Sequence, residues 1–379
     1  MTGAAGATAA GRKEGGRAVL KPRPGVMEIE PYVPGADKGP GGRPAHKLSA
    51  NESALGASPK AVEAFRAAGA SLHLYPDGAA SALRDTIADV HGLDATRIVC
   101  GAGSDEILQL LARAYLGPDD SIVQTRHGFL VYSLAATACG AKTLMAPELR
   151  LTANVDQLLA AVDDATRIVF LANPNNPTGT YISDAEVRRL REALREDILL
   201  VVDCAYAEYM DASDYGDPAR LVDDFDNIVM TRTFSKIYGL GGLRLGWGYC
   251  PAPVADALNR IRGPFNVSAA AIAAGVAAVR DQDFVARNRT HNASERGRLE
   301  QRLGGLGCEF VPSAANFILL RPPPESGRTA TDAIAFLAER GVIVRGVAAY
   351  GLPDWFRVSI GSTEANDAFL SAISDFIEI

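Results

Sequence analysis

The residues best suited to catalysis or ligand binding lie between positions 227 and 248. A short apolar run at 228–230 is typical of a buried strand, and a hydroxyl-rich turn at 231–235 follows it and leads directly to Lys236. A lysine just past a strand end can be held in a pocket, where burial and a cationic neighbour lower its pKa and make the amine nucleophilic. The stretch therefore indicates a reactive amine.

The same stretch offers groups that could bind a phosphate. Ser235 supplies a hydroxyl, Arg244 supplies a guanidinium, and closely spaced glycines leave backbone N–H groups accessible. A lysine for an aldehyde, with a hydroxyl and a guanidinium for a phosphate, describes a site for pyridoxal phosphate. A Ser-Lys pair also occurs by chance in many chains, so an exposed surface lysine stays an alternative until the rest of the chain is considered.

Composition sets the bounds for the remaining interpretation. The chain has 379 residues, of which 47% are hydrophobic and 22% charged, which is typical of a globular protein with one large and one smaller domain. A net charge of -7 without a basic run argues against nucleic acid or an anionic membrane as a partner. No run of about 18 apolar residues predicts a membrane-spanning helix, and the first residues lack the apolar core of a secretory signal.

Cysteine and histidine usage favours a reducing compartment and no metal. The five cysteines are scattered and odd in number, so we expect free thiols and a cytoplasmic protein rather than a disulfide framework. The five histidines are scattered as well, so we predict no metal site.

Strands alternate with helices from about 97 to 250, and the strands are apolar without polar alternation. This pattern predicts an α/β fold with a mostly parallel sheet that helices cover on both faces. In such sheets ligands bind at the carboxyl ends of the strands. The candidate functional residues that lie just past predicted strand ends are Ser104, Phe129, Asn176, Asp203 and Lys236.

Two of these positions carry an argument of their own. The glycine turn 101–103 leads into a predicted helix at Ser104, and a helix N-terminus of this kind is a potential anion site, although many such turns bind nothing. Asp203 ends an apolar strand, and a buried carboxylate is costly unless it is paired or hydrogen-bonded. A cap or turn former at the strand end is the alternative interpretation.

From about Pro264 the pattern changes to that of a smaller α+β domain. We therefore predict an N-terminal tail and arm at 1–46, a large domain at 47–262 and a small C-terminal domain at 263–379. Arg345 and Arg357 lie in apolar strands of this domain, where a guanidinium meets either a carboxylate or phosphate ligand or an internal acid.

Taken together, these motifs resemble the fold-type-I pyridoxal-phosphate aminotransferases, and among them the histidinol-phosphate aminotransferases. The resemblance extends from about Tyr32 to the end of the chain, with the motifs in the family's order and spacing. The matching motifs are Tyr75-Pro76-Asp77, Gly103-Ser104-Asp105-Glu106, 173–179, Asp203-x-x-Tyr206, Thr233-Phe234-Ser235-Lys236, Arg244 and Arg357-Val358-Ser359-Ile360-Gly361.

The resemblance implies catalytic roles for three of these residues. Lys236 would bind the cofactor aldehyde covalently and, once displaced by the substrate amine, would transfer protons as general base and acid. Asp203 would pair with the pyridine nitrogen and keep it protonated. Tyr206 would hydrogen-bond the phenolic oxygen of the cofactor.

The remaining cofactor contacts are also implied by the resemblance. Asn176 would share the phenolic oxygen with Tyr206, and Phe129 would stack on the ring. The phosphate would be held by Ser104 and Asp105 through backbone N–H groups, and by Ser235 and Arg244. Tyr75 would reach the same phosphate from the partner subunit, which implies a homodimer.

For the substrate, the resemblance implies that Arg345 and Arg357, with Tyr32 and Asn316 nearby, meet the phosphate of histidinol phosphate. The carboxylates of 2-oxoglutarate or glutamate would use the same positive charge, so one site serves both half-reactions. The implied function is transamination between these compounds, which aminates imidazole-acetol phosphate in histidine biosynthesis.

Two positions depart from the family's pattern. The residue after Asp203 is Cys204, where the family often has glutamate, and Phe129 stands in a His-Gly-Phe segment where the family often has Pro-x-Tyr. An aromatic amino-acid aminotransferase therefore stays open, as does a pyridoxal-phosphate-dependent amino-acid-phosphate decarboxylase of the same fold. A binding or regulatory protein without catalysis is the third alternative, against which the intact Asp203, Tyr206 and Lys236 argue.

Overall fold

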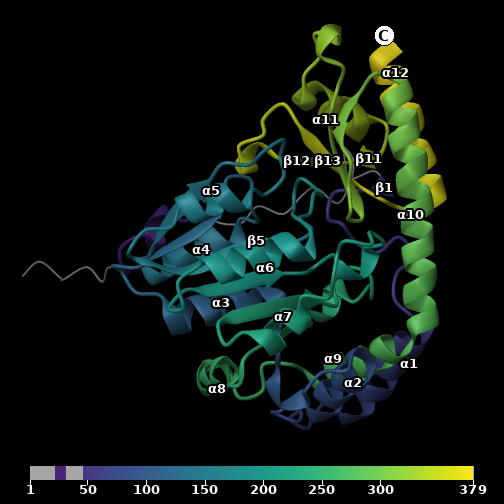
Figure 1. The fold of residues 1–379 in the computed structure, drawn as a ribbon. Helices are drawn as coiled ribbons and strands as arrows, with labels where there is room; N and C mark the ends of the chain where they lie inside the picture. The colour runs from purple at the N-terminus through teal and green to yellow at the C-terminus, as the bar shows by residue number, and fades with distance from the viewer. Residues whose placement is uncertain (1–21, 31–45, 379) are drawn as a thin grey trace, which may run out of the picture.

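The computed structural model describes residues 22–30 and 46–378, arranged as a large α/β unit with a smaller unit beside it (Figure 1). Tyr32 and most of the predicted N-terminal tail and arm lie outside the described residues. The segment 22–30 contains one turn of 3-10 helix, and its Arg23 donates a hydrogen bond of 2.7 Å to the carbonyl of Ala138.

A central sheet of seven strands organises the large unit. In spatial order the strands are β2 (Ile98–Gly101), β8 (Gly246–Tyr249), β7 (Ile228–Thr233), β6 (Leu199–Asp203), β5 (Thr166–Ala172), β3 (Ser121–Thr125) and β4 (Lys142–Ala146). β8 runs antiparallel to both of its neighbours, and every other pair in the sheet is parallel. The predicted α/β fold with a mostly parallel sheet is confirmed.

Helices cover both faces of this sheet, which explains why its central strands β5 and β6 are mostly apolar and do not alternate with polar residues. Along β6, Leu199 and Val201 pack on one face, whereas Leu200 and Val202 pack on the other. One face is covered by α3 (Ser104–Tyr115), α4 (Val131–Cys139) and α8 (Ala252–Ile261). The other is covered by α2 (Ser81–His91), α5 (Val155–Ala160), α6 (Asp184–Ala193) and α7 (Ala219–Asp224).

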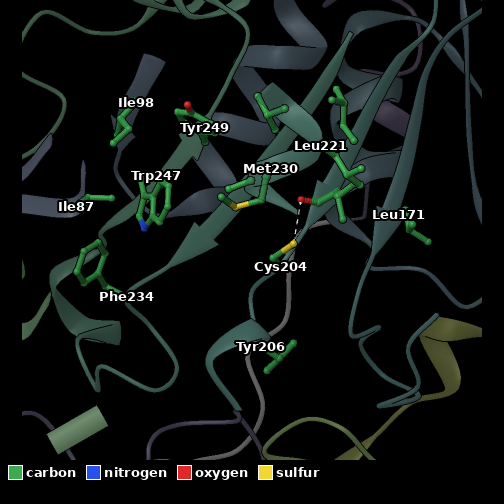
Figure 2. Close-up of a cluster of buried hydrophobic side chains, with 14 of the residues drawn as sticks. Ile87, Ile98, Leu171, Cys204, Tyr206, Leu221, Met230, Phe234, Trp247 and Tyr249 are labelled. Atoms are coloured by element: carbon green, nitrogen blue, oxygen red, sulfur yellow. Dashed lines mark hydrogen bonds between the residues drawn. The ribbon is translucent and has the colours of Figure 1, made fainter. Parts of the chain in front are cut away.

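The core between the sheet and helices α2, α5, α6 and α7 reaches the carboxyl edge of the sheet (Figure 2). Trp247 of β8 packs among Ile87, Met230 and Phe234, and the same cluster continues to Tyr206 beyond the end of β6. Residues that begin the loops after β6 and β7 are therefore anchored in the core. All five cysteines are buried and have no disulfide partner among the described residues.

The smaller unit contains an antiparallel sheet of four strands. In spatial order they are β12 (Arg345–Gly346), β13 (Phe356–Ser359), β10 (Phe317–Arg321) and β9 (Glu309–Val311). Helices α11 (Ala330–Glu339) and α12 (Thr363–Glu378) pack on this sheet and form a separate core with it. The chain also enters this unit near its start, because β1 (His46–Lys47) pairs in parallel with β11 (Val342–Ile343).

Two helices join the units. α9 (Ala269–Arg280) packs against α1 (Pro59–Ala68) and α2 in the large unit, although it follows the boundary predicted at 262/263. α10 (Gln282–Gly305) then runs from this group to the small unit (Figure 1), with Val285 in the large core and Leu299 in the small one. The division at 1–46, 47–262 and 263–379 stays a prediction.

Neither membrane spans nor metal clusters are found in the described part of the chain. Within residues 22–30 and 46–378, no helix is both long enough and apolar enough to cross a bilayer. The same residues hold no group of three or more His, Cys, Asp or Glu side chains that could bind a metal ion.

Candidate active site

A cavity of about 530 Å³ lies at the carboxyl edge of the large sheet, where residues of the small unit close it from the other side. This volume is in the range of small-molecule and cofactor sites. Its lining includes most of the predicted site residues: Ser104, Asp105, Phe129, Asn176, Asp203, Tyr206, Ser235, Lys236, Arg244, Arg345 and Arg357. Strand ends separated by more than one hundred residues thus meet at one site.

One end of the cavity is built to hold an anion. α3 begins there at Ser104, after Gly103, whose φ of +89° favours glycine, and no side chain caps the helix. Arg244 donates to Ser235 Oγ at 3.3 Å and forms an ion pair with Asp105 at 3.1 Å. A Cβ at Gly103 would come within 2.5 Å of the Arg244 guanidinium, so a larger residue there would force this guanidinium to move.

Asp203 lies in the floor of the cavity as the last residue of β6. Its two carboxylate oxygens accept hydrogen bonds from Tyr132 Oη at 2.8 Å and Thr231 Oγ1 at 3.0 Å. Burial raises the pKa of Asp203 to about 6, and these two hydrogen bonds oppose that rise. The carboxylate is therefore ionised at neutral pH despite being buried.

Lys236 enters the same cavity from the turn after β7. Its Nζ donates to the carbonyl of Ala50 at 3.2 Å and lies 5.8 Å from the centre of the Tyr206 ring. Burial, followed by the positive charge of Arg357, lowers the pKa of Lys236 to about 8. A larger fraction of this amine is neutral near pH 7 than for an exposed lysine, as the sequence pattern predicts for a nucleophile.

Tyr206 follows β6 by three residues and is buried beside the lysine. Its hydroxyl accepts a hydrogen bond of 3.1 Å from Asn51 Nδ2, and its ring packs edge-on against Phe317. Burial raises the pKa of Tyr206 to about 12, against the opposing effects of Arg357 and Asn51. The phenol is thus neutral and keeps its proton at physiological pH.

The small unit supplies positive charge at the far side of the cavity. Arg345 of β12 and Arg357 of β13 are direct partners in the antiparallel register. Arg357 is buried and donates to Asn176 Oδ1 and, at 3.0 Å, to the carbonyl of Ser49. Phe129, on the wall of the cavity, packs edge-on against Tyr132.

Two predicted residues lie elsewhere in the structure. Tyr75 is 82% exposed and stacks on Phe265 with 4.7 Å between ring centres. Asn316 is buried outside the cavity lining, where its amide donates to the carbonyls of Asn51 and Glu52. The substrate role of Asn316 and the cofactor role of Tyr75 stay predictions.

Sequence reasoning missed several residues that shape the cavity. Tyr132 and Thr231 hold Asp203, and Asn51 contacts Tyr206. Asn51 falls in the segment where the folded body begins, and Thr231 falls in the hydroxyl-rich turn before Lys236. Nothing in the local pattern around Tyr132 distinguishes it from an ordinary core tyrosine.

Comparison with known proteins identifies the family. The sequence model for "Aminotransferase class I and II" matches residues 44–373, which is most of the chain. The chain belongs to the class I and II aminotransferases. The predicted fold-type-I aminotransferase is thereby confirmed.

Individual aminotransferases are similar over almost the full length. The histidinol-phosphate aminotransferase of Maricaulis maris is 52% identical over 359 residues, covering 95% of this chain and 99% of that protein. The histidinol-phosphate aminotransferase of Paramagnetospirillum magneticum is 53% identical, over an alignment that covers 94% of this chain and 98% of that protein.

Solved aminotransferases share the fold. The histidinol-phosphate aminotransferase of Sinorhizobium meliloti, in complex with pyridoxal-5'-phosphate, superposes with a TM-score of 0.87 at 28% identity, over 96% of this chain and 99% of that one. Aspartate aminotransferase of Thermus thermophilus with maleate gives 0.79 at 21% identity, over 88% of this chain and 91% of that one, a likeness of fold alone.

The hydrogen bond from Tyr132 to Asp203 yields a prediction about pH dependence. Tyr132→Phe removes a bond that favours the carboxylate, so the pKa of Asp203 should rise further above about 6. Since the carboxylate then protonates at higher pH, we expect the acidic limb of the kcat/KM profile to move up by about one pH unit, the order of one hydrogen bond to a charged group.

The matched control is Tyr249→Phe, which removes a hydroxyl bonded to Asp223 away from the cavity. This variant should leave the acidic limb in place. An unchanged limb in Tyr132→Phe would contradict the assigned role of its hydroxyl.

Proposed function

We propose that this aminotransferase uses pyridoxal phosphate to transfer the amino group between histidinol phosphate and 2-oxoglutarate or glutamate. The observation that carries the proposal is one cavity in which a lysine of lowered pKa and a buried carboxylate lie between an anion site and two arginines. Its most similar relatives reported above are histidinol-phosphate aminotransferases at about half sequence identity.

The groups that line the cavity fit pyridoxal phosphate. The α3 N-terminus, Ser235 and Arg244 suit its phosphate. The Asp203 carboxylate suits its ring nitrogen, and the Lys236 amine suits its aldehyde. When bound, the cofactor supplies an electron sink for the charge that develops at the substrate Cα.

Lys236 is the group we assign to proton transfer. A lysine with a pKa of about 8 can both accept and return a proton near neutral pH, which an exposed lysine does poorly. Its amine would accept the proton from the substrate Cα and would donate a proton again later in the transfer of the amino group. The Ala50 carbonyl, which also lines the cavity, holds the amine by a hydrogen bond of 3.2 Å.

Asp203 and Tyr206 would hold the reacting system in the correct charge state. Asp203 is ionised above about pH 6 and so would stabilise a protonated ring nitrogen. Tyr206, whose pKa is about 12, stays a neutral hydrogen-bond donor and would share the phenolic oxygen with Asn176. Phe129 on the cavity wall provides a flat surface for the ring.

The paired arginines would select substrates by their anionic groups. Arg345 and Arg357 lie opposite each other on neighbouring strands, so their charges act on the same part of the cavity. A phosphate monoester and a carboxylate are both suited to guanidinium groups. One site can therefore take histidinol phosphate in one half-reaction and 2-oxoglutarate in the other.

We further propose that the enzyme is a cytoplasmic homodimer in which Tyr75 completes the partner's phosphate site. Tyr75 and Phe265 form an exposed aromatic stack, and Leu72 and Leu74, which precede Tyr75 in the sequence, are exposed as well. Exposed apolar groups gathered in this way are typical of an interface. A second copy of the chain is the occupant that the cofactor role of Tyr75 requires.

A donor screen with 2-oxoglutarate tests the proposed reaction. We expect kcat/KM, measured as glutamate formed, to be highest for histidinol phosphate, because its phosphate meets two guanidinium groups. Much faster turnover of phenylalanine or tyrosine would make the enzyme an aromatic aminotransferase. Release of carbon dioxide without 2-oxoglutarate would instead indicate a decarboxylase.

Removal of the amine tests the role of Lys236. We expect Lys236→Ala to lose transamination entirely, because the described residues that line the cavity include no second lysine and no histidine to move the proton. The variant should still retain pyridoxal phosphate through the contacts of Ser235 and Arg244, which equilibrium dialysis measures. Lys47→Ala, which removes an exposed lysine paired with Glu52, is the control and should keep normal turnover.

Subunit mixing tests the dimer. If Tyr75 acts across the interface, a hybrid of Lys236→Ala and Tyr75→Ala chains contains one site with every side chain intact. Refolding the two variants together should then raise activity well above the sum of the separate preparations. Activity that stays at that sum would place Tyr75 within its own subunit's site or outside catalysis.

A further inference from the structure

The segment 49–51 lines the cavity and contacts a charged side chain from each unit, Lys236 of the large unit and Arg357 of the small unit. The carbonyl of Ala50 accepts from Lys236 Nζ at 3.2 Å, and the carbonyl of Ser49 accepts from Arg357 at 3.0 Å. Each contact uses the backbone, so neither depends on the type of side chain in the segment. Asn51 differs, because its contact with the site is made by its side chain.

Asn51 is held by four hydrogen bonds at a fully buried position. Its N–H donates to Ser359 Oγ at 2.8 Å, and the Ser359 hydroxyl donates to Asn51 Oδ1 at 3.1 Å. Its carbonyl accepts from Asn316 at 3.0 Å, and its Nδ2 donates to Tyr206 Oη at 3.1 Å. Its φ of +55° lies in the left-handed region, which asparagine tolerates better than most residues.

The direction of the last bond decides what Tyr206 can do. A phenol has one proton and accepts through its oxygen lone pairs, so accepting from Asn51 leaves the Tyr206 proton free for another acceptor. Among the described residues, Asn51 is the hydrogen-bond partner that the structure gives to this hydroxyl. The free proton is then available to a group bound in the cavity, which Tyr206 lines.

We infer that Asn51 is a positioning residue that makes the Tyr206 hydroxyl a hydrogen-bond donor toward the phenolic oxygen of bound pyridoxal phosphate. This inference rests on the proposed function, because it takes Tyr206 as a cofactor contact. Ser359 fixes the orientation of the Asn51 amide from β13, the strand that also carries Arg357. The small unit thereby sets the hydrogen-bonding role of a tyrosine in the large unit.

The test is a pH titration of the visible absorption of the holoenzyme. A donor to the phenolic oxygen stabilises the form that carries negative charge there. Without Asn51 the Tyr206 hydroxyl keeps its proton but loses the bond that orients it, so its donation should weaken and the absorption midpoint should move to higher pH. Asn51→Gly removes the amide and keeps a residue that accepts positive φ. We expect its midpoint to rise by about half a pH unit, the order of one hydrogen bond.

Asn51→Asp gives a second, independent measurement. The carboxylate keeps the size of the side chain but accepts where the amide donated, so Tyr206 would turn its proton toward it. Loss of the donor and the added negative charge both favour the protonated form, and the midpoint should rise further than in Asn51→Gly. Ser359→Ala, which leaves the amide in place without its orienting partner, should give a smaller rise.

A double-mutant cycle separates an effect through Tyr206 from general loosening of the fold. In a Tyr206→Phe background the further change Asn51→Gly should leave the midpoint where Tyr206→Phe alone puts it. Ser121→Ala removes a buried hydroxyl that donates to Asp163 at the start of β3, the end of that strand opposite the cavity, and should not shift the midpoint.

The outcomes distinguish the inference from the function on which it rests. A wild-type protein that acquires no visible band with pyridoxal phosphate overturns both. A wild-type band with an unshifted midpoint in folded Asn51→Gly and Asn51→Asp overturns the inference alone. An equal shift with and without the Tyr206 hydroxyl also overturns it, because Asn51 would then act by another route.

Discussion

The structure depends on keeping one carboxylate charged at the end of a buried strand. Burial alone would favour the neutral acid at Asp203, and hydrogen bonds from the hydroxyl groups of Tyr132 and Thr231 oppose that effect. Tyr132 is held in turn by stacking on Phe170 of the neighbouring strand β5, with 4.7 Å between ring centres. The central sheet thus fixes the position and the charge of Asp203 together.

The charged groups of the cavity come from different parts of the chain. Asp203 and Lys236 meet because the neighbouring strands β6 and β7 end at the same edge of the sheet. Asp203 is paired in register with Thr231, and Lys236 follows in the loop directly after β7. The arginines come from a separate antiparallel sheet, and the segment 49–51 lies between the two. The proposed cofactor contacts and the proposed substrate-binding charges therefore belong to structural units with separate cores.

The sequence predicted those features that depend on local pattern. Continuous apolar strands followed by polar residues indicate a covered parallel sheet, and its carboxyl edge then brings Asp203 near Lys236. Asn51 could not be found this way, because its partners Tyr206 and Ser359 lie 155 and 308 residues away. Tyr132 was missed for the same reason, since its apolar surroundings in α4 are those of any core residue. Side-chain orientation across distant segments is set by packing, which a single sequence does not display.

α10 has a consequence for how the molecule loses its structure. This helix has 24 residues and extends about 36 Å, with one end packed in the core under the central sheet and the other packed beneath the arginine-bearing strands. Melting either core would expose the apolar groups at one end of this helix and remove the support of the turns that continue into the other core. Thermal denaturation should consequently be one cooperative transition, in which the lysine and the arginines lose their arrangement at the same temperature.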